Sequence, residues 1–194
     1  MKHTRKIILA STSPRRRELL GKLGLSFVVK PGDYEEDMTL KLSPHKLAMT
    51  LSAGKARAVA KGERNSLVIA ADTFVVLGHD LLGKPKSAKE AKSMLRRLSG
   101  RRVDILTGLT MIDTKTNKRV SKVATTRVFF KRFSEKEISL YVASGEPMDK
   151  AGAFAIQGLG AALIKRIEGD FLAAMGLPLF VLAAELKKFG VEVL

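Results

Sequence analysis

The sequence has no cysteine and no tryptophan, and only three histidines among its 194 residues. Without cysteine the protein cannot form disulfides, use a thiol nucleophile or bind zinc through thiolates. The histidines, His3, His45 and His79, lack the spacing of metal ligands, so any metal is expected to have oxygen ligands. No apolar run reaches the roughly 18–20 residues of a membrane span, and no secretory leader opens the chain. These absences predict a cytoplasmic protein with no membrane partner.

Acidic residues are few beside the basic ones, 19 against 35, which leaves a formal net charge of +16. Such an excess indicates an anionic substrate or partner, unless it serves solubility alone. The basic residues are spread along the chain and aromatic residues make up only 6% of it, whereas nucleic-acid binders tend to cluster cations among stacking aromatics. The composition therefore favours a protein that binds anions and argues against nucleic acid as the partner.

Alternating strand and helix patterns predict an α/β fold with a mixed sheet and flanking helices. The strands are expected at Lys6–Ala10, Ser26–Lys30, Leu67–Leu77 (a strand pair or one bent strand), Val103–Ile112, Lys118–Phe130 and Ala161–Ile167. The helices are expected from Pro14 to a stop at Gly24 and at Ser43–Lys61, Ser87–Leu98, Ser134–Ala143 and Leu177–Phe189. Capping boxes are expected at Ser87 with Glu90 and at Ser134 with Glu137. A short polar turn between the fourth and fifth strands predicts an antiparallel hairpin.

Three adjacent arginines, Arg15, Arg16 and Arg17, occupy the first turn of the first predicted helix. Cations are out of place there, because the macrodipole and the unbonded N–H groups of a helix start favour negative charge. An anion bound between them and the helix would explain their position, and phosphate fits because guanidinium groups bind it bidentately. Ser11 and Ser13 add hydroxyl donors to the same turn. The alternative is a solvated, mildly unfavourable surface cluster.

Asp72 is the only charged residue in Leu67–Leu77, the most apolar window of the chain. Burying an isolated carboxylate is costly, so Asp72 is expected to be paired with a cation, bound to a metal or protonated. Such a residue often marks a functional site, and a structural aspartate that caps a bend is the alternative. Glu36, in the acidic stretch 33–37, is a candidate second carboxylate for a divalent cation.

The segment Gly145–Gly160 holds more glycines and polar groups than plain packing requires. Within it, Gln157 could present its amide to the edge of a base or hydrogen-bond the backbone of its own loop. No glycine-rich dinucleotide fingerprint follows a strand, and no P-loop motif occurs. Lys55 and Lys84, taken alone, have the pattern of solvated lysines.

Taken together, these segments resemble the Maf family of nucleoside triphosphate pyrophosphatases along nearly the whole chain. The matching blocks are LASTSPRRRELL (Leu9–Leu20), AADT (Ala70–Thr73), GKP (Gly83–Pro85), MLRRLSG (Met94–Gly100), SGEPMDKAGAFAIQG (Ser144–Gly158) and GLPL (Gly176–Leu179). The resemblance implies a fold similar to that of inosine-triphosphate pyrophosphatases, with residues 1–194 forming one domain: a mixed, twisted sheet with two lobes around a deep cleft. It implies cleavage between the α- and β-phosphates, giving a nucleoside monophosphate and pyrophosphate, with Mg²⁺ or Mn²⁺ as cofactor. It is compatible with a homodimer.

The resemblance also assigns roles to single residues. Asp72 matches the family's proton acceptor, which activates the attacking water, and Glu36 matches its other acid at the cleft. Both are expected to hold the metal. The phosphate-facing positions are matched by Ser13, Arg15, Arg16, Lys55 and Lys84. One cleft would then account for both the arginines at a helix start and the buried aspartate.

Arg15, Thr73 and Gln157 match the branch of the family that acts on dTTP and UTP, whereas the branch that acts on 7-methyl-GTP carries Trp, Gln and Glu there. An amide suits a pyrimidine because it can donate to O4 and accept from N3–H. Two departures bear on substrate preference and activity: Val103 stands where the family usually has His, and Phe171–Met175 replaces a more polar stretch. We therefore expect a pyrimidine triphosphate pyrophosphatase. The alternative is a basic nucleic-acid-binding or cell-division regulatory protein with a vestigial cleft.

Overall fold

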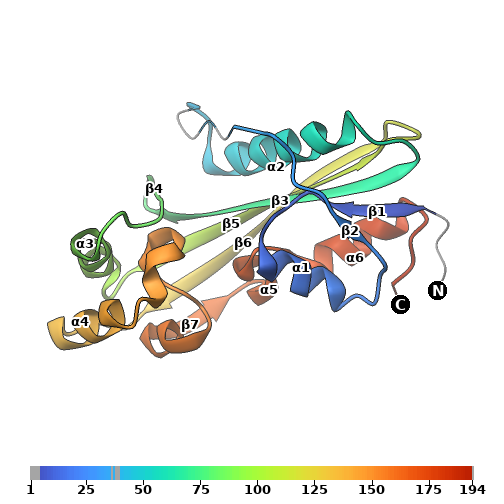
Figure 1. The fold of residues 1–194 in the computed structure, drawn as a ribbon. Helices are drawn as coiled ribbons and strands as arrows, with labels where there is room; N and C mark the ends of the chain where they lie inside the picture. The colour runs from blue at the N-terminus through green and yellow to red at the C-terminus, as the bar shows by residue number, and fades with distance from the viewer. Residues whose placement is uncertain (1–4, 36, 38–39, 194) are drawn as a thin grey trace. The chain divides into compact units, whose positions relative to one another are not determined.

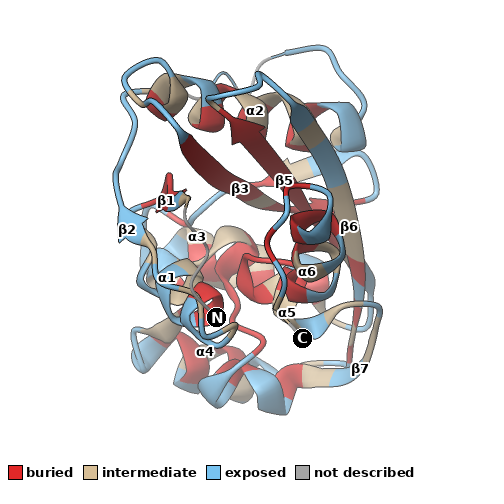
Figure 2. Ribbon diagram, turned by 90° about the vertical axis from the view of Figure 1, so that its right-hand side faces the viewer, coloured by how far each residue is buried: buried red, intermediate tan, exposed pale blue. Residues whose placement is uncertain are grey.

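The computed structural model describes residues 5–35, 37 and 40–193, and the chain divides into two compact units. The first unit comprises Met1–Thr73, Leu106–Ala124 and Leu172–Leu194, and the second comprises Phe74–Ile105 and Thr125–Phe171. Three long strands contribute residues to both units: β3 (Ser66–Leu77), β5 (Arg102–Asp113) and β6 (Arg119–Phe130) (Figure 1). Figure 2 shows β3 and β5 buried along most of their length, which makes them the centre of the core.

The sheet is mixed, as the sequence predicts. Its strand order is β2-β1-β3-β5-β6-β7, and β4 (Asp80–Leu82) pairs with β3 outside this path. β1 (Lys6–Leu9) pairs in parallel with both β2 (Val28–Val29) and β3. β4 runs antiparallel to β3, and β7 (Ile164–Glu168) runs antiparallel to β6. The window 66–77 is thus one continuous strand rather than a strand pair.

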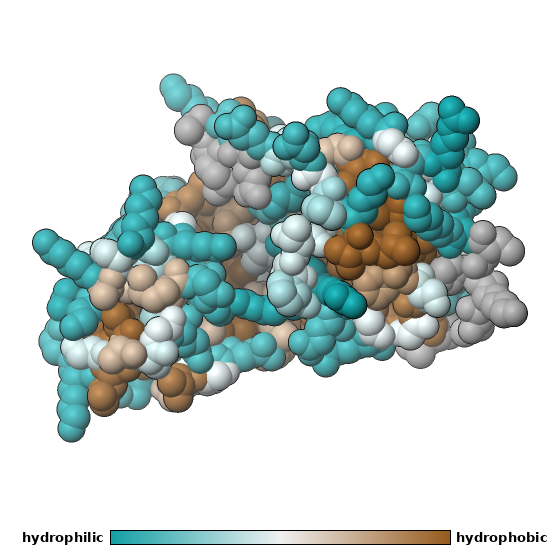
Figure 3. Space-filling view, in the orientation of Figure 1, coloured by the Kyte–Doolittle hydropathy of each residue, from teal (hydrophilic) through white to brown (hydrophobic). Residues whose placement is uncertain are grey.

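In the first unit, the two valines of the edge strand β2 are 45% and 41% exposed, and a hydrophobic surface patch lies over this edge (Figure 3). α2 (Pro44–Ala60) covers one face of β1 and β3, and α1 (Pro14–Gly21) and α6 (Leu179–Lys187) lie on the other (Figures 1 and 2). Under α2, a cluster of buried hydrophobic residues joins helix to strands: Ile8, Ala10, Ala56, Val59, Val68, Ala70 and Ile112. The small residues of α2 allow this close approach.

α1 and α2 begin where the capping residues predict, whereas α6 begins at Leu179, two residues later than expected. The hydroxyl of Ser13 accepts a hydrogen bond from the backbone N–H of Arg16, and Pro14 is the first residue of α1. Near the C-terminus the prediction was incomplete, because a short helix, α5 (Phe171–Met175), precedes α6. Gly176, with a φ of +124°, separates the two helices in a conformation that other residues rarely adopt.

The second unit contains α3 (Ala88–Leu98), α4 (Glu135–Ala143) and three short 3-10 turns, η1 (Glu146–Asp149), η2 (Ala151–Ala153) and η3 (Gly158–Leu163). The predicted capping box of α4 is present, but that of α3 is wrong. The Glu90 carboxylate accepts from the backbone N–H of Lys86 at 2.7 Å, so Ser87 caps α3 alone. β7 begins later than expected because η3 takes up residues 161–163.

Among the helices of the described residues, none has both the length and the apolar composition that crossing a bilayer requires.

Candidate functional site

Asp72 and Lys55 form a largely buried ion pair in the first unit. Asp72 lies in β3 with 5% of its surface exposed, and its carboxylate accepts a hydrogen bond from Lys55 Nζ of α2. The Lys55 side chain is only 18% exposed. The expectation that Asp72 has a partner is confirmed, since an unpaired buried carboxylate would be costly. Lys55 is therefore not the solvated lysine that its local sequence suggests.

The parallel pair β1–β3 ends just before the candidate residues. Its register runs from Lys6 opposite Ser66 to Leu9 opposite Ile69, and the N–H of Ala10 donates to the carbonyl of Ile69 at 2.8 Å. The turn that opens α1 and the residues Asp72 and Thr73 both follow this point. They therefore lie just beyond the carboxyl end of β1 and of its parallel pairing with β3, the side of such a pair where ligands of α/β proteins bind.

Asp72 and Thr73 reach opposite faces of the sheet, as neighbours in a strand do. Asp72 contacts Lys55 of α2, whereas the hydroxyl of Thr73 contacts Arg16 of α1. One strand thus carries a carboxylate on one face and a hydroxyl on the other.

Three acceptors from three segments orient the guanidinium of Arg16. Its Nε donates to the carbonyl of Gly176 at 3.0 Å. Its two Nη atoms donate to Ser11 Oγ and Thr73 Oγ1, each at 3.4 Å. Arginine suits such a position because its planar fork presents several N–H groups in fixed directions.

A buried chain of hydroxyls sets the direction of these hydrogen bonds. Thr107 is completely buried, and its Oγ1 donates to the carbonyl of Ala173 at 2.7 Å. Because that bond uses the only hydroxyl proton of Thr107, its 2.9 Å contact with Thr73 must have Thr73 as the donor. Thr73 is then left to accept from Arg16. The bonds all run one way, from Arg16 through Thr73 and Thr107 to a backbone carbonyl.

Replacing Thr107 by valine, which has nearly the same shape, is expected to lower the free energy of unfolding by about 1–3 kcal/mol, because the half-buried hydroxyl of Thr73 loses its acceptor and the carbonyl of Ala173 loses its donor. Denaturant unfolding of this variant, of Thr73→Val and of the double variant would measure the coupling. The double variant should lose less than the sum of the single losses, since it removes both ends of one bond. Strictly additive losses would contradict the hydrogen bond between the two threonines.

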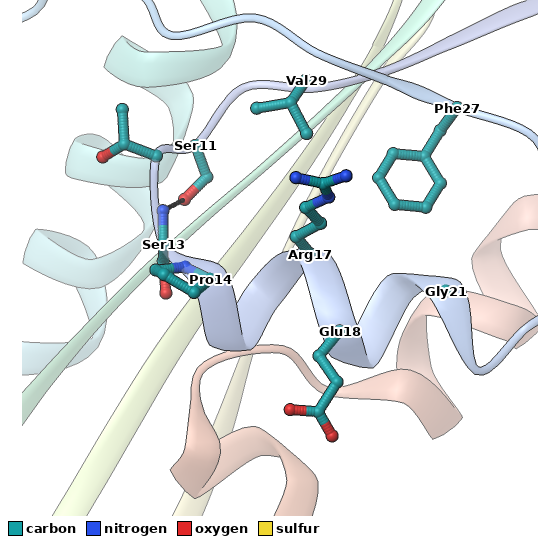
Figure 4. A pocket seen from close by; sticks show the side chains of 9 residues that line it. Ser11, Ser13, Pro14, Arg17, Glu18, Gly21, Phe27 and Val29 are labelled. Carbon is teal, nitrogen blue, oxygen red and sulfur yellow. Dashed lines mark hydrogen bonds between the residues drawn. The ribbon is translucent and has the colours of Figure 1, made fainter.

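The three arginines of the first turn are not equivalent. Arg15 and Arg16 are half-buried, whereas Arg17 is exposed and lies on the helix face of Pro14, Glu18 and Gly21. This face borders an open pocket of about 470 Å³, in which the Arg17 guanidinium lies near Phe27 and Val29 (Figure 4). The pocket is lined by Ser11, Thr12, Ser13, Pro14, Arg17, Glu18, Gly21, Phe27 and Val29. Only two arginines of the triplet therefore face the protein.

The second unit carries two further predicted residues, Lys84 and Gln157, both exposed. Gln157 precedes η3, and its side chain makes no capping hydrogen bond there. The loop of Lys84 is joined to the glycine-rich segment by a bond from the N–H of Gly152 to the carbonyl of Gly83 at 2.9 Å.

Glu36 lies outside the described residues. Within the described part of the chain, no three side chains of His, Cys, Asp or Glu gather closely enough to hold a metal ion. Sequence reasoning missed Thr107 and the carbonyl of Gly176. The only signal for Thr107 was a polar residue in a mostly apolar run, and Thr110 in the same strand gives the same signal.

An α/β protein that places a buried carboxylate, hydroxyls and an oriented arginine at the carboxyl end of parallel strands has the components of a phosphate-handling site. The family model described as Maf-like protein matches residues 6–189, and the chain belongs to this family. The dTTP/UTP pyrophosphatase of Methanosarcina barkeri is 50% identical over 190 residues, which are 97% of this chain and 96% of that protein. The dTTP/UTP pyrophosphatase of Methanosarcina mazei is 48% identical over the same shares of the two chains.

Among solved structures, the Ham1 protein of Staphylococcus aureus is similar to this chain with a TM-score of 0.48 and 18% sequence identity. The similarity covers 65% of this chain and 72% of that one. A likeness this distant adds nothing to the family assignment.

Proposed function

We propose that this protein hydrolyses dTTP and UTP to the nucleoside monophosphate and pyrophosphate. The observation that carries the proposal is the identity of about half the residues, over nearly the full length, to proteins named for this activity. The one-way chain of hydrogen bonds from Arg16 to Thr73 also supports the proposal. It joins a residue that we assign to the phosphates to the threonine that is typical of the pyrimidine branch. The same identity favours an enzyme over a nucleic-acid-binding or regulatory protein.

In the proposed reaction, a water molecule attacks the α-phosphorus and Asp72 accepts its proton. The new bond joins the water oxygen to the α-phosphorus. The bond from that phosphorus to the bridging oxygen breaks, and pyrophosphate leaves with the electron pair. Lys55 hydrogen-bonds the Asp72 carboxylate and so helps to hold it in place. Arg16, already oriented by three acceptors, needs no rearrangement to stabilise charge that develops on the phosphates.

We assign the remaining predicted residues to the substrate. Ser13, Arg15 and Arg16 from the helix start, together with Lys55 and Lys84, offset the charge of the triphosphate. Thr73 and Gln157 serve selection of the pyrimidine. We also propose that residues 1–194 form one domain with two lobes.

The proposed cofactor is Mg²⁺ or Mn²⁺, held by Asp72 and Glu36. The donor set fits such hard cations, because carboxylate oxygens are their preferred ligands and the chain has no thiol. When bound, the cation neutralises triphosphate charge. We propose the cytoplasm, where nucleoside triphosphates are made and used, as the location. A homodimer stays a prediction.

Product analysis tests the proposed cleavage position. Hydrolysis of dTTP in ¹⁸O-labelled water is expected to give dTMP and pyrophosphate in equal amounts, with the label in dTMP, because attack occurs at the α-phosphorus. Chromatography and mass spectrometry measure both. The Asp72→Asn protein, purified in the same way, controls for contaminating phosphatases. dTDP and orthophosphate as primary products would contradict the proposal.

A further inference from the structure

Glu146 holds the C-terminal part of the glycine-rich segment of the second unit through hydrogen bonds. It opens η1, and its Oε2 accepts a hydrogen bond from the backbone N–H of Leu159 at 2.9 Å. Its Oε1 accepts from the N–H of Gly160 at 2.8 Å and from the hydroxyl of Tyr141 at 2.9 Å. One carboxylate thus takes two backbone donors and one side-chain donor.

Tyr141, on α4, fastens the other side. Its hydroxyl accepts from the backbone N–H of Ala155 at 3.0 Å while it donates to Glu146. Four hydrogen bonds therefore join two side chains to the backbone on both sides of Gln157 and to each other. We call Tyr141 and Glu146 the loop clamp.

The loop clamp also explains two of the glycines. A Cβ at Gly158, where φ is +68°, would lie 2.3 Å from Oε2 of Glu146. A Cβ at Gly160 would lie 2.3 Å from the carbonyl of Ala155 and 2.6 Å from the Tyr141 hydroxyl. No side chain fits at either position while the clamp is closed. Glycine is therefore needed at these two positions because the side chains of the loop clamp approach the backbone closely, and its role is not limited to making the loop flexible.

The protonation states of Tyr141 and Glu146 agree with the directions of the hydrogen bonds in the loop clamp. Burial alone would raise the pKa of Glu146, but the N–H groups of Gly160 and Leu159 and the Tyr141 hydroxyl outweigh it and hold that pKa below its usual value. Burial, together with the neighbouring Glu146 charge, raises the pKa of Tyr141 despite the bond from Ala155. At neutral pH the glutamate is thus an ionised acceptor and the tyrosine a protonated donor.

We propose that Tyr141 and Glu146 are positioning residues that hold Gln157 where it reads the pyrimidine. This inference rests on the proposed function. Gln157 is exposed, its amide is not spent on capping η3, and the backbone is fixed two residues on either side of it. A loop ordered before binding spares the entropy of ordering it around each substrate. It also limits where the Gln157 amide can lie. A fixed amide is needed to distinguish the base edge of thymine or uracil from that of cytosine.

The substrate preference of the variants distinguishes a positioning role of the loop clamp from a purely structural role. Thymine and uracil present an O4 acceptor, whereas cytosine presents an amino donor at the same position. A clamp that only stabilises the fold would, when broken, lower turnover of all three triphosphates alike. A clamp that positions Gln157 would, when broken, lower turnover of dTTP and UTP more than that of CTP.

The test compares Glu146→Gln, whose amide nitrogen cannot accept from a backbone N–H, with wild type. The ratio of kcat/KM for dTTP to that for CTP is expected to fall about tenfold, in line with the loss of one or more hydrogen bonds. Tyr141→Phe keeps the ring and is expected to shift the ratio in the same direction by about threefold. The matched control is Glu137→Gln, which changes a half-buried carboxylate of the α4 capping box, and it should leave the ratio unchanged. An unchanged ratio in a folded Glu146→Gln protein would overturn the inference.

Hydrogen exchange of the wild-type protein provides a measurement that needs no variant. The amides of Ala155, Leu159 and Gly160 are expected to be protected without substrate, and exchange as fast as in an unfolded chain would also overturn the inference. A wild type that releases no pyrophosphate from any pyrimidine triphosphate would overturn the proposed function instead. A wild type that hydrolyses dTTP, with variants of unchanged ratio, would overturn the positioning role alone.

Discussion

Replacing Asp72 by asparagine is expected to lower kcat for dTTP by about 10²- to 10⁴-fold, the usual contribution of a positioned general base. The amide keeps the volume of the side chain and can still accept a hydrogen bond from Lys55. It cannot take the proton of the attacking water or bind a cation as a carboxylate does. Pyrophosphate release at saturating Mg²⁺ or Mn²⁺ measures the effect.

Asp113→Asn is the matched control, because Asp113 is another buried carboxylate of the first unit and pairs with Arg5 at 2.9 Å. Burial would raise the pKa of Asp113, but hydrogen bonds from Thr116 and Lys115, with the charge of Arg5, hold it below the usual value. The stability that this carboxylate contributes is therefore present at neutral pH and is lost as the pH falls through its lowered pKa. The control should lose stability at neutral pH and keep kcat. Turnover of Asp72→Asn within a few-fold of wild type would contradict the role of Asp72.

Replacing Arg16 by lysine is expected to lower kcat/KM for dTTP by about 10²- to 10³-fold, the scale seen when one transition-state donor is removed. Lysine keeps the positive charge but cannot donate at once to Gly176, Thr73 and Ser11, so its ammonium group is not held in one direction. It also cannot bind a phosphate group through two parallel N–H bonds. Steady-state kinetics with dTTP measures the loss.

Arg17→Lys makes the same chemical change one residue later. Arg17 is exposed, with its guanidinium beside Phe27 and Val29, and it takes no part in the bonds of Arg16 to Gly176 and Thr73, so kcat/KM is expected to stay within about threefold of wild type. Because lysine keeps the charge, the absence of a loss in both variants would mean that only the positive charge of the helix start matters. A larger loss in Arg17→Lys would mean that the wrong face of α1 has been assigned to the substrate.

Features that depend on a few neighbouring residues could be predicted from the sequence. Ser13 with Pro14 starts α1, and Ser134 with Glu137 forms a capping box, because the groups that bond lie within one helical turn. The apolar run around Asp72 becomes a buried strand for an equally local reason, and its lone carboxylate indicated that a partner was needed. Where two local donors competed for Glu90, the local pattern failed, since the N–H of Lys86 took the carboxylate in place of Ser87.

The sequence by itself therefore determined the mixed α/β class, most helix starts and the buried aspartate. The tertiary structure alone decided the partners of the polar groups. Lys55 lies 17 residues from Asp72, Thr107 lies 34 from Thr73, and the carbonyl of Gly176 lies 160 from Arg16. The loop clamp likewise needs η1 and η3 to meet. The physical reason is that hydrophobic periodicity and capping act within one or two turns of chain. A buried donor can take any acceptor that strand register and helix packing bring within 3 Å, wherever it lies in the sequence.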